Sequence, residues 1–318
     1  MLSEFDIIAR YFTQPCRRTL LGVGDDAALV QPAPGMTLAA ATDMLVAGRH
    51  FFADANPRQL GHKALAVNLS DMAAMGATPR WAMLALALPE INEGWLAEFA
   101  DGFMALARRH EVDLVGGDTT QGPLNLCVHI IGEVPVGCAL RRDGAKPGDQ
   151  IWISGRLGDA ALALAHLQHR ITLEIEALDA FLQALHMPKP RIALGQALRG
   201  IASAAIDISD GLVADLGHIL ERSGVGASID FAAIPKTAIL GRHAANPVAR
   251  EAALAGGDDY ELCFTAPLSE KARIGRIAQE LELPLTRIGH IDAGDKLVVR
   301  DETGKAMNIE RRGYDHFA

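Results

Sequence analysis

The segment Lys63–Gly76 reads KALAVNLSDMAAMG. Apolar side chains on nearly every side predict a buried helix, which begins at Asn56-Pro57 as an N-cap followed by proline and ends at the glycine. Asn68 and Asp71 are three positions apart and therefore share one face of this helix. A buried carboxylate without a partner is costly, so such groups are paired, protonated or bound to cations. The segment thus predicts a buried helix that carries a functional acid.

Acidic segments, mostly glycine-rich, recur along the rest of the chain, and we interpret the glycine-bearing ones as turns. If they converge, their carboxylates repel one another by about 4 kcal/mol per pair at roughly 4 Å and an effective dielectric near 20. Divalent cations relieve this repulsion, and oxygen ligands favour Mg²⁺ or Ca²⁺ over zinc. Glycine beside an acid also leaves backbone N–H groups accessible to phosphate oxygens. The pattern therefore predicts a metal–nucleotide phosphate site. The segments are Gly24-Asp25-Asp26, Thr42-Asp43, Gly116-Gly117-Asp118, Asp207-Ile208-Ser209-Asp210-Gly211 and Gly256-Gly257-Asp258-Asp259.

Composition sets the class of protein. A length of 318 residues favours two domains, and the charged, glycine-bearing segment 141–149 predicts their junction, giving domains 1–140 and 141–318. A chain that is 49% hydrophobic and 22% charged is typical of soluble globular proteins. The net charge of −9 argues against a general nucleic-acid or anionic-membrane binder. Four cysteines without CxxC spacing and an acidic N-terminus without a signal sequence predict a cytoplasmic protein.

Hydrophobic patterns predict a mixed order of strands and helices. Because the order is not strictly βαβ, we expect an α/β fold built as α+β layers rather than a doubly wound sheet. Predicted helices, besides the one above, follow Asn92 and cover 212–220 and 269–281. Predicted strands cover 38–41, 81–88, 124–134, 150–154, 204–208, 228–231, 260–264, 286–291 and 297–300.

The common phosphate and metal motifs are missing. The chain has no Walker A loop, no protein-kinase HRD or DFG signature and no GxGxxG turn. Counted from Asp207, the glycine stands at the fifth position and not at the sixth, which argues against an EF-hand. No HExxH and no paired Cys/His spacing indicates zinc. A protein that binds nucleotide phosphates with this sequence uses a less common architecture.

The ordered set of motifs resembles the thiamine-monophosphate kinases of the aminoimidazole-ribonucleotide-synthetase-like ATP-binding superfamily. The likeness covers essentially the whole chain, and although one Gly-Asp pair alone is weak, the ordered set is specific. The matching segments are GVGDDAA at 22–28, ATD at 41–43 with His50-Phe51, the helix at 63–76, GGDTT at 116–120, GAKPGD at 144–149, DISDGL at 207–212, GGDDYEL at 256–262 and GYDHF at 313–317.

The resemblance implies an enzyme that phosphorylates thiamine monophosphate to thiamine diphosphate with ATP and several Mg²⁺ ions. It also implies two α/β domains with the synthetase-like fold and a homodimer whose N-terminal domains form a shared β-barrel. Neither a nucleic acid nor a membrane is implied as a partner.

The same resemblance assigns roles to individual residues. Asp43, Asp71 and Asp118 are expected to be catalytic, because they hold the Mg²⁺ ions that clamp the ATP oxygens and the acceptor phosphate. The expected metal ligands are Asp26, Thr42, Asp43, Asp71, Asp118, Asp207 and Asp210. The expected nucleotide contacts are Gly117, Asp118, Arg142 and Ser209, and His50, Asp258 and Tyr314 are expected to line the thiamine phosphate pocket. One position departs from the family, because relatives often carry glutamate where this chain has Asp258.

Structural alternatives stay open for most of these residues. Asp71 can pair with Lys63, Asp25 and Asp26 can stabilise a turn, and Gly116-Gly117-Asp118 can be a turn that ends a strand. Asp210 can be the N-cap of the following helix. His50 and Tyr314 can serve packing, and Asp215 has no role in the expected site.

Other functions remain as alternatives. A selenide-activating dikinase is disfavoured because Cys16 is followed by two arginines, and a carbamoyl-dehydrating maturation protein is disfavoured because no cysteine stands near Ala318. Aminoimidazole ribonucleotide synthetase shares the expected fold. A non-catalytic metal or nucleotide sensor would bind ATP without acceptor-dependent release of ADP.

Overall fold

The computed structural model describes residues 3–242, 246–309, 311 and 313–314. The chain divides into two compact units. Unit 1 comprises Met1–Met72 and Ala77–Gly137, and unit 2 comprises Ala73–Gly76 and Cys138–Ala318. The predicted mixed α/β architecture in two parts is confirmed.

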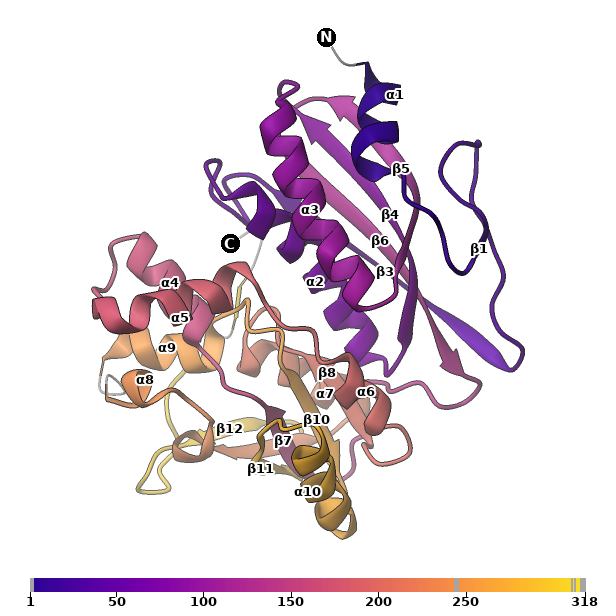
Figure 1. The fold of residues 1–318 in the computed structure, drawn as a ribbon. Coiled ribbons are helices and arrows are strands. Elements are labelled where there is room, and N and C mark those ends of the chain that lie inside the picture. The colour runs from indigo at the N-terminus through magenta and orange to yellow at the C-terminus, as the bar shows by residue number, and fades with distance from the viewer. Residues whose placement is uncertain (1–2, 243–245, 310, 312, 315–318) are drawn as a thin grey trace. The chain divides into compact units, whose positions relative to one another are not determined.

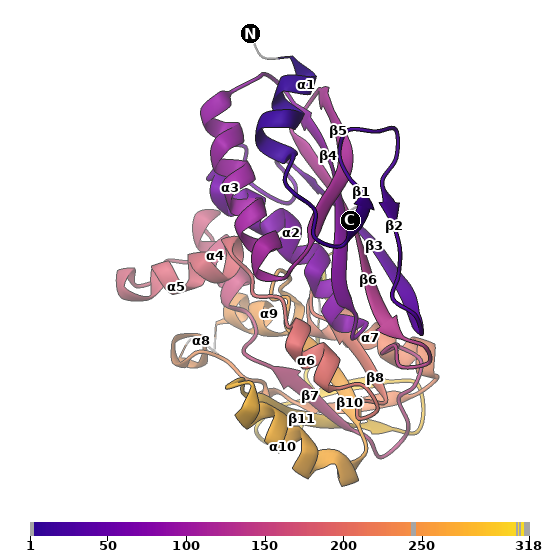
Figure 2. The ribbon, with the colours of Figure 1, turned by 45° about the vertical axis from the view of Figure 1, so that its right-hand side comes forward.

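Unit 1 is a four-stranded sheet in the order β3-β6-β4-β5, and Figures 1 and 2 show α2 and α3 on one of its faces. Only the β4–β5 pair is parallel. The short strands β1 and β2 form a separate antiparallel pair. In chain order the elements are α1 (Glu4–Ile7), the π-helix η1 (Ile8–Phe12), β1 (Thr19–Leu21), β2 (Leu29–Val30), β3 (Met36–Val46), α2 (Pro57–Ala74), β4 (Thr78–Leu88), α3 (Glu93–Arg109), β5 (Asp113–Gln121) and β6 (Asn125–Pro135).

Local capping explains where the two long helices of unit 1 begin. The Asn56 side chain accepts the N–H of Gln59 at 3.1 Å, and α2 starts at Pro57 as expected. The Asn92 side chain likewise accepts the N–H of Trp95 at 3.0 Å and caps α3.

The sheet of unit 1 has two unlike faces. Along β6, Leu126, Val128 and Ile130 are buried, whereas the residues between them are only partly buried. This alternation is that of a sheet with one covered face. On β3, Leu38 and Met44 are 42% and 56% exposed. An apolar strip therefore lies open on unit 1.

Unit 2 is built on a six-stranded sheet in the order β12-β9-β11-β7-β10-β8. All pairs are antiparallel except β12–β9. The elements are β7 (Gln150–Ser154), α4 (Asp159–Leu167), α5 (Ile175–His186), α6 (Ile192–Ala197), β8 (Ala204–Asp207), α7 (Leu212–Ser223), β9 (Gly226–Asp230), the 3₁₀ turn η2 (Phe231–Ala233), α8 (Ala238–Arg242), α9 (Pro247–Ala255), β10 (Leu262–Ala266), the 3₁₀ turn η3 (Leu268–Glu270), α10 (Lys271–Glu280), β11 (Leu285–Asp292) and β12 (Leu297–Arg300).

The core of unit 2 lies between this sheet and helices α4, α5, α7 and α9. Ile151, Ile153 and Cys263 belong to the buried cluster, which also holds residues of those four helices. Trp152 and Phe264 alternate with them along β7 and β10, and their rings stack on each other with centroids 6.4 Å apart. Both faces of the central strands are thus covered.

One expected turn is a strand. Gly116-Gly117-Asp118 lies inside β5, which continues to Gln121 in parallel pairing with β4. Gly117 has φ +149°, and a Cβ there would stand 1.8 Å from the Leu84 carbonyl oxygen. Glycine is needed here because two neighbouring strands approach closely, and not because the chain reverses.

Within the described residues, no helix has both the length and the hydropathy that a bilayer crossing requires.

Candidate functional site

The predicted acids of unit 1 lie on three different elements and one connecting segment. Asp26 is exposed between β1 and β2, and its N–H donates to the Asp25 carboxylate at 2.9 Å. Asp25 therefore supports the turn that presents Asp26. Asp43 lies on β3, Asp71 on α2 and Asp118 on β5.

The strand register sets the spacing of Asp43 and the Gly117-Asp118 pair. Asp43 pairs with Val128 of β6, Val128 with Leu84 of β4, and Leu84 with Gly117 of β5. At about 4.8 Å per strand, this row spans roughly 14 Å. Among the described residues, no three His, Cys, Asp or Glu side chains converge as a ready metal site. The sheet therefore distributes its acids along a row instead of gathering them around one ion.

Thr42 and His50 each make a contact within unit 1. The Thr42 hydroxyl lies 2.7 Å from Nδ1 of His129, and strand alternation places it on the face opposite Asp43. His50 Nδ1 accepts the N–H of Val46 at 2.9 Å. That hydrogen bond holds the turn after β3.

The predicted polar face of α2 is present. Asn68 is fully buried and donates from Nδ2 to the Ala64 carbonyl at 3.1 Å, while its Oδ1 has no hydrogen-bond partner in the described part of the chain. Asp71 follows one turn later and is partly buried. Acceptor oxygens thus occupy this face of an otherwise apolar helix.

Unit 2 brings four predicted site residues together through its backbone. The Ser209 carbonyl accepts the N–H of Asp258 at 2.9 Å, and the Asp210 carbonyl accepts the N–H of Tyr314 at 3.0 Å. Three segments far apart in the sequence therefore meet at the loop 207–211, which we call the hub loop. The remaining residues of the last motif, Asp315–Phe317, lie outside the described residues.

Two further hydrogen bonds extend β8 into the hub loop. The Ile208 N–H donates to the Glu261 carbonyl at 2.8 Å, and its carbonyl accepts the N–H of Tyr260 at the same distance. Asp258 and Tyr260 have φ +69° and +49°. Non-glycine residues adopt such angles only when their surroundings hold them there. The 258–260 segment is thus fixed against the hub loop.

Asp215, which has no role in the expected site, is central to this geometry. It lies in the first turn of α7 with 3% of its surface exposed. Its Oδ2 accepts the N–H groups of Ser209, Asp210 and Gly211 at 3.1, 3.0 and 3.0 Å. In the sequence, the apolar neighbours Leu212, Val213 and Leu216 were the one indication that Asp215 would be buried.

These contacts correct two expectations. Gly211 is the N-cap of α7 and makes no side-chain capping bond, so the alternative role of Asp210 as the N-cap is wrong. The hub-loop N–H groups at 209–211 are already engaged by Asp215, so the expected accessibility of this turn to phosphate oxygens is wrong as well.

The electrostatics around Asp215 suit a cation. Burial, followed by the charges of Asp207 and Asp210, raises the pKa of Asp215 to about 8. A cation beside Asp207 or Asp210 would offset this repulsion, and carboxylate oxygens are the ligands that Mg²⁺ prefers. The residues present therefore fit a magnesium ion.

The 256–261 segment is also anchored by its own acids. Asp259 accepts the Gly158 N–H with both carboxylate oxygens, at 3.0 and 2.9 Å, and burial of the carboxyl group raises its pKa. The Glu261 carboxylate accepts a hydrogen bond from Arg191 Nε at 2.7 Å. Both acids connect this segment to the rest of unit 2.

Arg142 is exposed in the segment before β7, where the Ser223 hydroxyl donates to its carbonyl at 2.9 Å. In the described part of the chain, the hydrogen bonds that join other segments to the hub loop do not include Arg142.

Comparison with known proteins defines the class first. The chain matches the models for the AIR synthase related protein, N-terminal domain, over residues 24–134, and C-terminal domain, over residues 146–302. It is 48% identical over 320 residues to the thiamine-monophosphate kinase of Salmonella typhimurium, covering 99% of this chain and 98% of that protein. The crystal structure of thiamine-monophosphate kinase from Stenotrophomonas maltophilia K279a is 47% identical, with a TM-score of 0.85 and 95% of each chain covered. AaThiL, solved in complex with AMPPCP and TMP, is 32% identical with a TM-score of 0.79, covering 90% of this chain and 89% of that one.

Together these matches place the chain among the AIR synthase-related proteins. Within that class it belongs to the thiamine-monophosphate kinase family of enzymes.

Proposed function

We propose that this chain phosphorylates thiamine monophosphate to thiamine diphosphate by direct in-line transfer from ATP. The observation that supports this most is the hub loop, which joins Ser209, Asp210, Asp258 and Tyr314 by backbone hydrogen bonds. These residues belong to the motifs expected to contact nucleotide, metal and thiamine phosphate. The AaThiL complex supports the choice of substrates, because its AMPPCP is an analogue of ATP.

The acids of both units would hold Mg²⁺. In unit 1 these are Asp26, Asp43, Asp71 and Asp118, and in unit 2 they are Asp207 and Asp210. Thr42, whose hydroxyl lies on the face of β3 opposite Asp43, would be a further ligand. Mg²⁺ commonly takes only one or two protein carboxylates and completes its shell with phosphate oxygens and water, so a spread row of acids suits several ions. When bound, the ions neutralise the charge that develops on the phosphate oxygens.

The chain itself supplies positioning and charge. The acceptor is a phosphate that is already ionised near neutral pH, so no strong general base and no covalent nucleophile is required. Gly117 and the Ser209 hydroxyl would contact the nucleotide, and Arg142 would add a positive charge. His50, Asp258 and Tyr314 would orient thiamine monophosphate. Asp258 has one methylene less than the glutamate common in relatives, and its positive φ would set the direction of the shorter side chain.

The decisive experiment incubates the full-length protein with ATP, Mg²⁺ and thiamine monophosphate, and measures thiamine diphosphate by chromatography. We expect ADP and thiamine diphosphate in equal amounts, with no product from free thiamine. ATP binding without acceptor-dependent ADP release would instead support the alternative function, a non-catalytic metal or nucleotide sensor.

Asp71→Asn tests the proposed catalytic acids. The substitution keeps the size of the side chain but removes a charge that would hold Mg²⁺, so we expect kcat to fall by roughly 10³-fold or more. Glu98→Gln, at an exposed acid on α3, is the matched control and should keep wild-type turnover. Circular dichroism should show the same fold for both, and near-normal kcat for Asp71→Asn at saturating Mg²⁺ would reject the assignment.

We further propose that the open face of the unit 1 sheet pairs with a second copy to form the shared barrel. Support comes from the apolar strip with Leu38 and Met44, and from Leu20 and Leu29, which are 70% and 55% exposed on β1 and β2. Closing two sheets into a barrel buries such side chains and removes unpaired strand edges.

A further inference from the structure

The hub loop has little room to change shape. Gly211 has φ +119°, and a Cβ there would stand 2.7 Å from the Cα of Ala255. A Cβ on Gly257 would stand 2.3 Å from the Ser209 carbonyl oxygen. The loop is therefore tightly packed by neighbouring backbone on these sides.

One side chain holds the loop from within. Asp215 Oδ2 accepts three successive N–H groups, those of Ser209, Asp210 and Gly211, all within 3.1 Å. The carbonyl of Ser209 accepts the N–H of Asp258, and the carbonyl of Asp210 accepts the N–H of Tyr314. Asp215 thus engages the N–H groups of Ser209, Asp210 and Gly211, and the two other motif segments engage the carbonyls of Ser209 and Asp210.

We propose that Asp215 is a positioning residue that sets the Ser209 hydroxyl and the Asp210 carboxylate for nucleotide and metal. The inference rests on the proposed function. A consequence is that Ser209 meets the nucleotide through its hydroxyl, because its N–H group is occupied. Asp215 itself touches neither substrate nor metal.

Hydrogen exchange tests the geometry independently of activity. In the wild-type, metal-free protein we expect the amides of 209–211 to be protected, because each is bonded to a buried acceptor. In Asp215→Asn, which keeps the size but replaces the carboxyl group by an amide, their exchange should speed up by about tenfold. Unprotected amides in the wild type would overturn the proposal without any variant.

Kinetics test the positioning. In Asp215→Asn we expect KM for ATP and the Mg²⁺ concentration at half-maximal activity each to rise by about tenfold, roughly the effect of one hydrogen bond. Ser209→Ala should raise KM for ATP while leaving the exchange of these amides unchanged.

Asp149→Asn is the matched control. Asp149 is also buried, with 5% exposed, and its carboxylate accepts the Lys146 N–H at 3.0 Å and the Ser203 hydroxyl at 2.6 Å. Asp149→Asn should lower the stability of the protein but leave KM and the Mg²⁺ dependence unchanged.

Equal kinetic effects in both variants, or faster exchange in Asp215→Asn without a kinetic change, would show that Asp215 is merely structural. A wild-type protein that forms no thiamine diphosphate would reject the proposed function, while exchange would still report on Asp215.

Discussion

At the scale of single residues, two buried acids of this protein, Asp113 and Asp215, each accept several backbone N–H groups. Asp113 accepts the N–H groups of Arg17 and Arg18 and the Thr19 hydroxyl, at distances between 2.8 and 3.1 Å, and so fixes the start of β1 to β5. Asp215 does the same for the hub loop. A carboxyl group can accept several N–H groups at once, so one acid can fix several loop residues.

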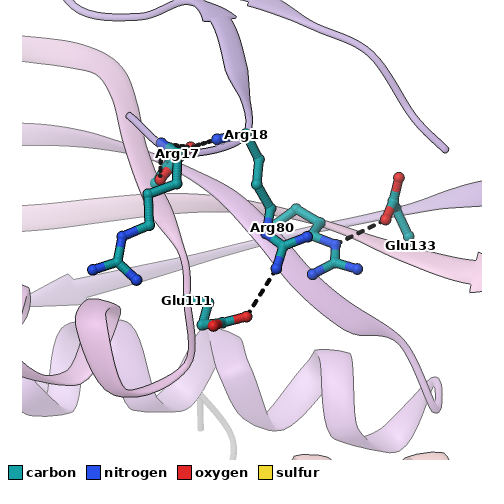
Figure 3. Close-up of polar contacts among 6 residues, drawn as sticks. Arg17, Arg18, Arg80, Glu111 and Glu133 are labelled. Atoms are coloured by element: carbon teal, nitrogen blue, oxygen red, sulfur yellow. Dashed lines mark hydrogen bonds and ion pairs between the residues drawn. The ribbon is translucent and has the colours of Figure 1, made fainter. Parts of the chain in front are cut away.

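Glu133 fixes the other end of the segment that carries Asp26. Its carboxylate accepts the Ala33 N–H at 2.6 Å and a hydrogen bond from Arg80 Nε at 2.8 Å. Figure 3 shows Arg80 directed toward Glu133, with Arg18 directed toward Glu111 nearby. Burial alone would raise the pKa of Glu133, but the Ala33 N–H and the Arg80 charge together hold it below its usual 4.5.

Glu133→Gln tests this contribution by its pH dependence. Because the folded pKa is lowered, the stabilisation is present above about pH 4.5 and is lost as the pH falls through the folded pKa. We expect the variant to be less stable than the wild type by about 2 kcal/mol at pH 7, with the difference shrinking as the pH falls through the folded pKa. Urea unfolding at several pH values measures it.

Glu111→Gln is the control for that experiment. Glu111 pairs with Arg18 at 2.9 Å, but the two side chains are 55% and 43% exposed. An exposed ion pair contributes little, so we expect a change below about 0.5 kcal/mol. A pH-independent loss in Glu133→Gln would argue for packing as the cause.

At the scale of elements, the pairing of β5 with β4 requires glycine at position 117 but not at the adjacent position 116. Gly117→Ala should destabilise the protein by about 3 kcal/mol, because the new Cβ would overlap the Leu84 carbonyl and the φ of +149° disfavours a side chain. At Gly116, the nearest atom to a new Cβ is Cγ of Met83 at 4.0 Å, so Gly116→Ala should cost less than about 1 kcal/mol. Thermal unfolding of the two variants compares them directly, and equal losses would contradict the close approach of β4 and β5.

Elements whose signals are local were predictable from the sequence. The Asn56-Pro57 and Asn92 caps marked the starts of α2 and α3, and the predicted bounds of β7 and β12 match the structure. The course of β5 through Gly116-Gly117 was not predictable, because pairing with β4 outweighs the local preference of glycine for turns. Asp215 was missed for a similar reason, since its partners are set by how the hub loop folds back.

The residues of the site that belong to sequence motifs were predictable. Ser209, Asp210, Asp258 and Tyr314 were named from sequence, and the hub loop joins them. Their roles toward nucleotide, metal and substrate stay predictions. Sequence spacing could not show which N–H groups the protein itself would occupy.

At the scale of the whole molecule, assembly can be tested on the apolar strip of unit 1. Met44→Lys places a charge on that strip, so we expect the mass in solution to fall from twice 33.9 kDa toward 33.9 kDa. Leu268→Lys, at a residue 63% exposed on η3 of unit 2, should leave the mass unchanged. Analytical ultracentrifugation measures both, and a wild-type monomer would reject the barrel proposal.

The contacts of the hub loop can form only in a certain order while the chain is being synthesised. Asp210 and Tyr314 lie roughly 100 positions apart, and at about 5–20 residues per second their synthesis is separated by roughly 5 to 20 s. During that interval Asp215 can already hold the loop, because it is only a few residues away, whereas the contact with Tyr314 cannot yet exist. The nascent chain can therefore form the Asp215 contacts early, and the contact with Tyr314 only after about 100 further residues have been synthesised.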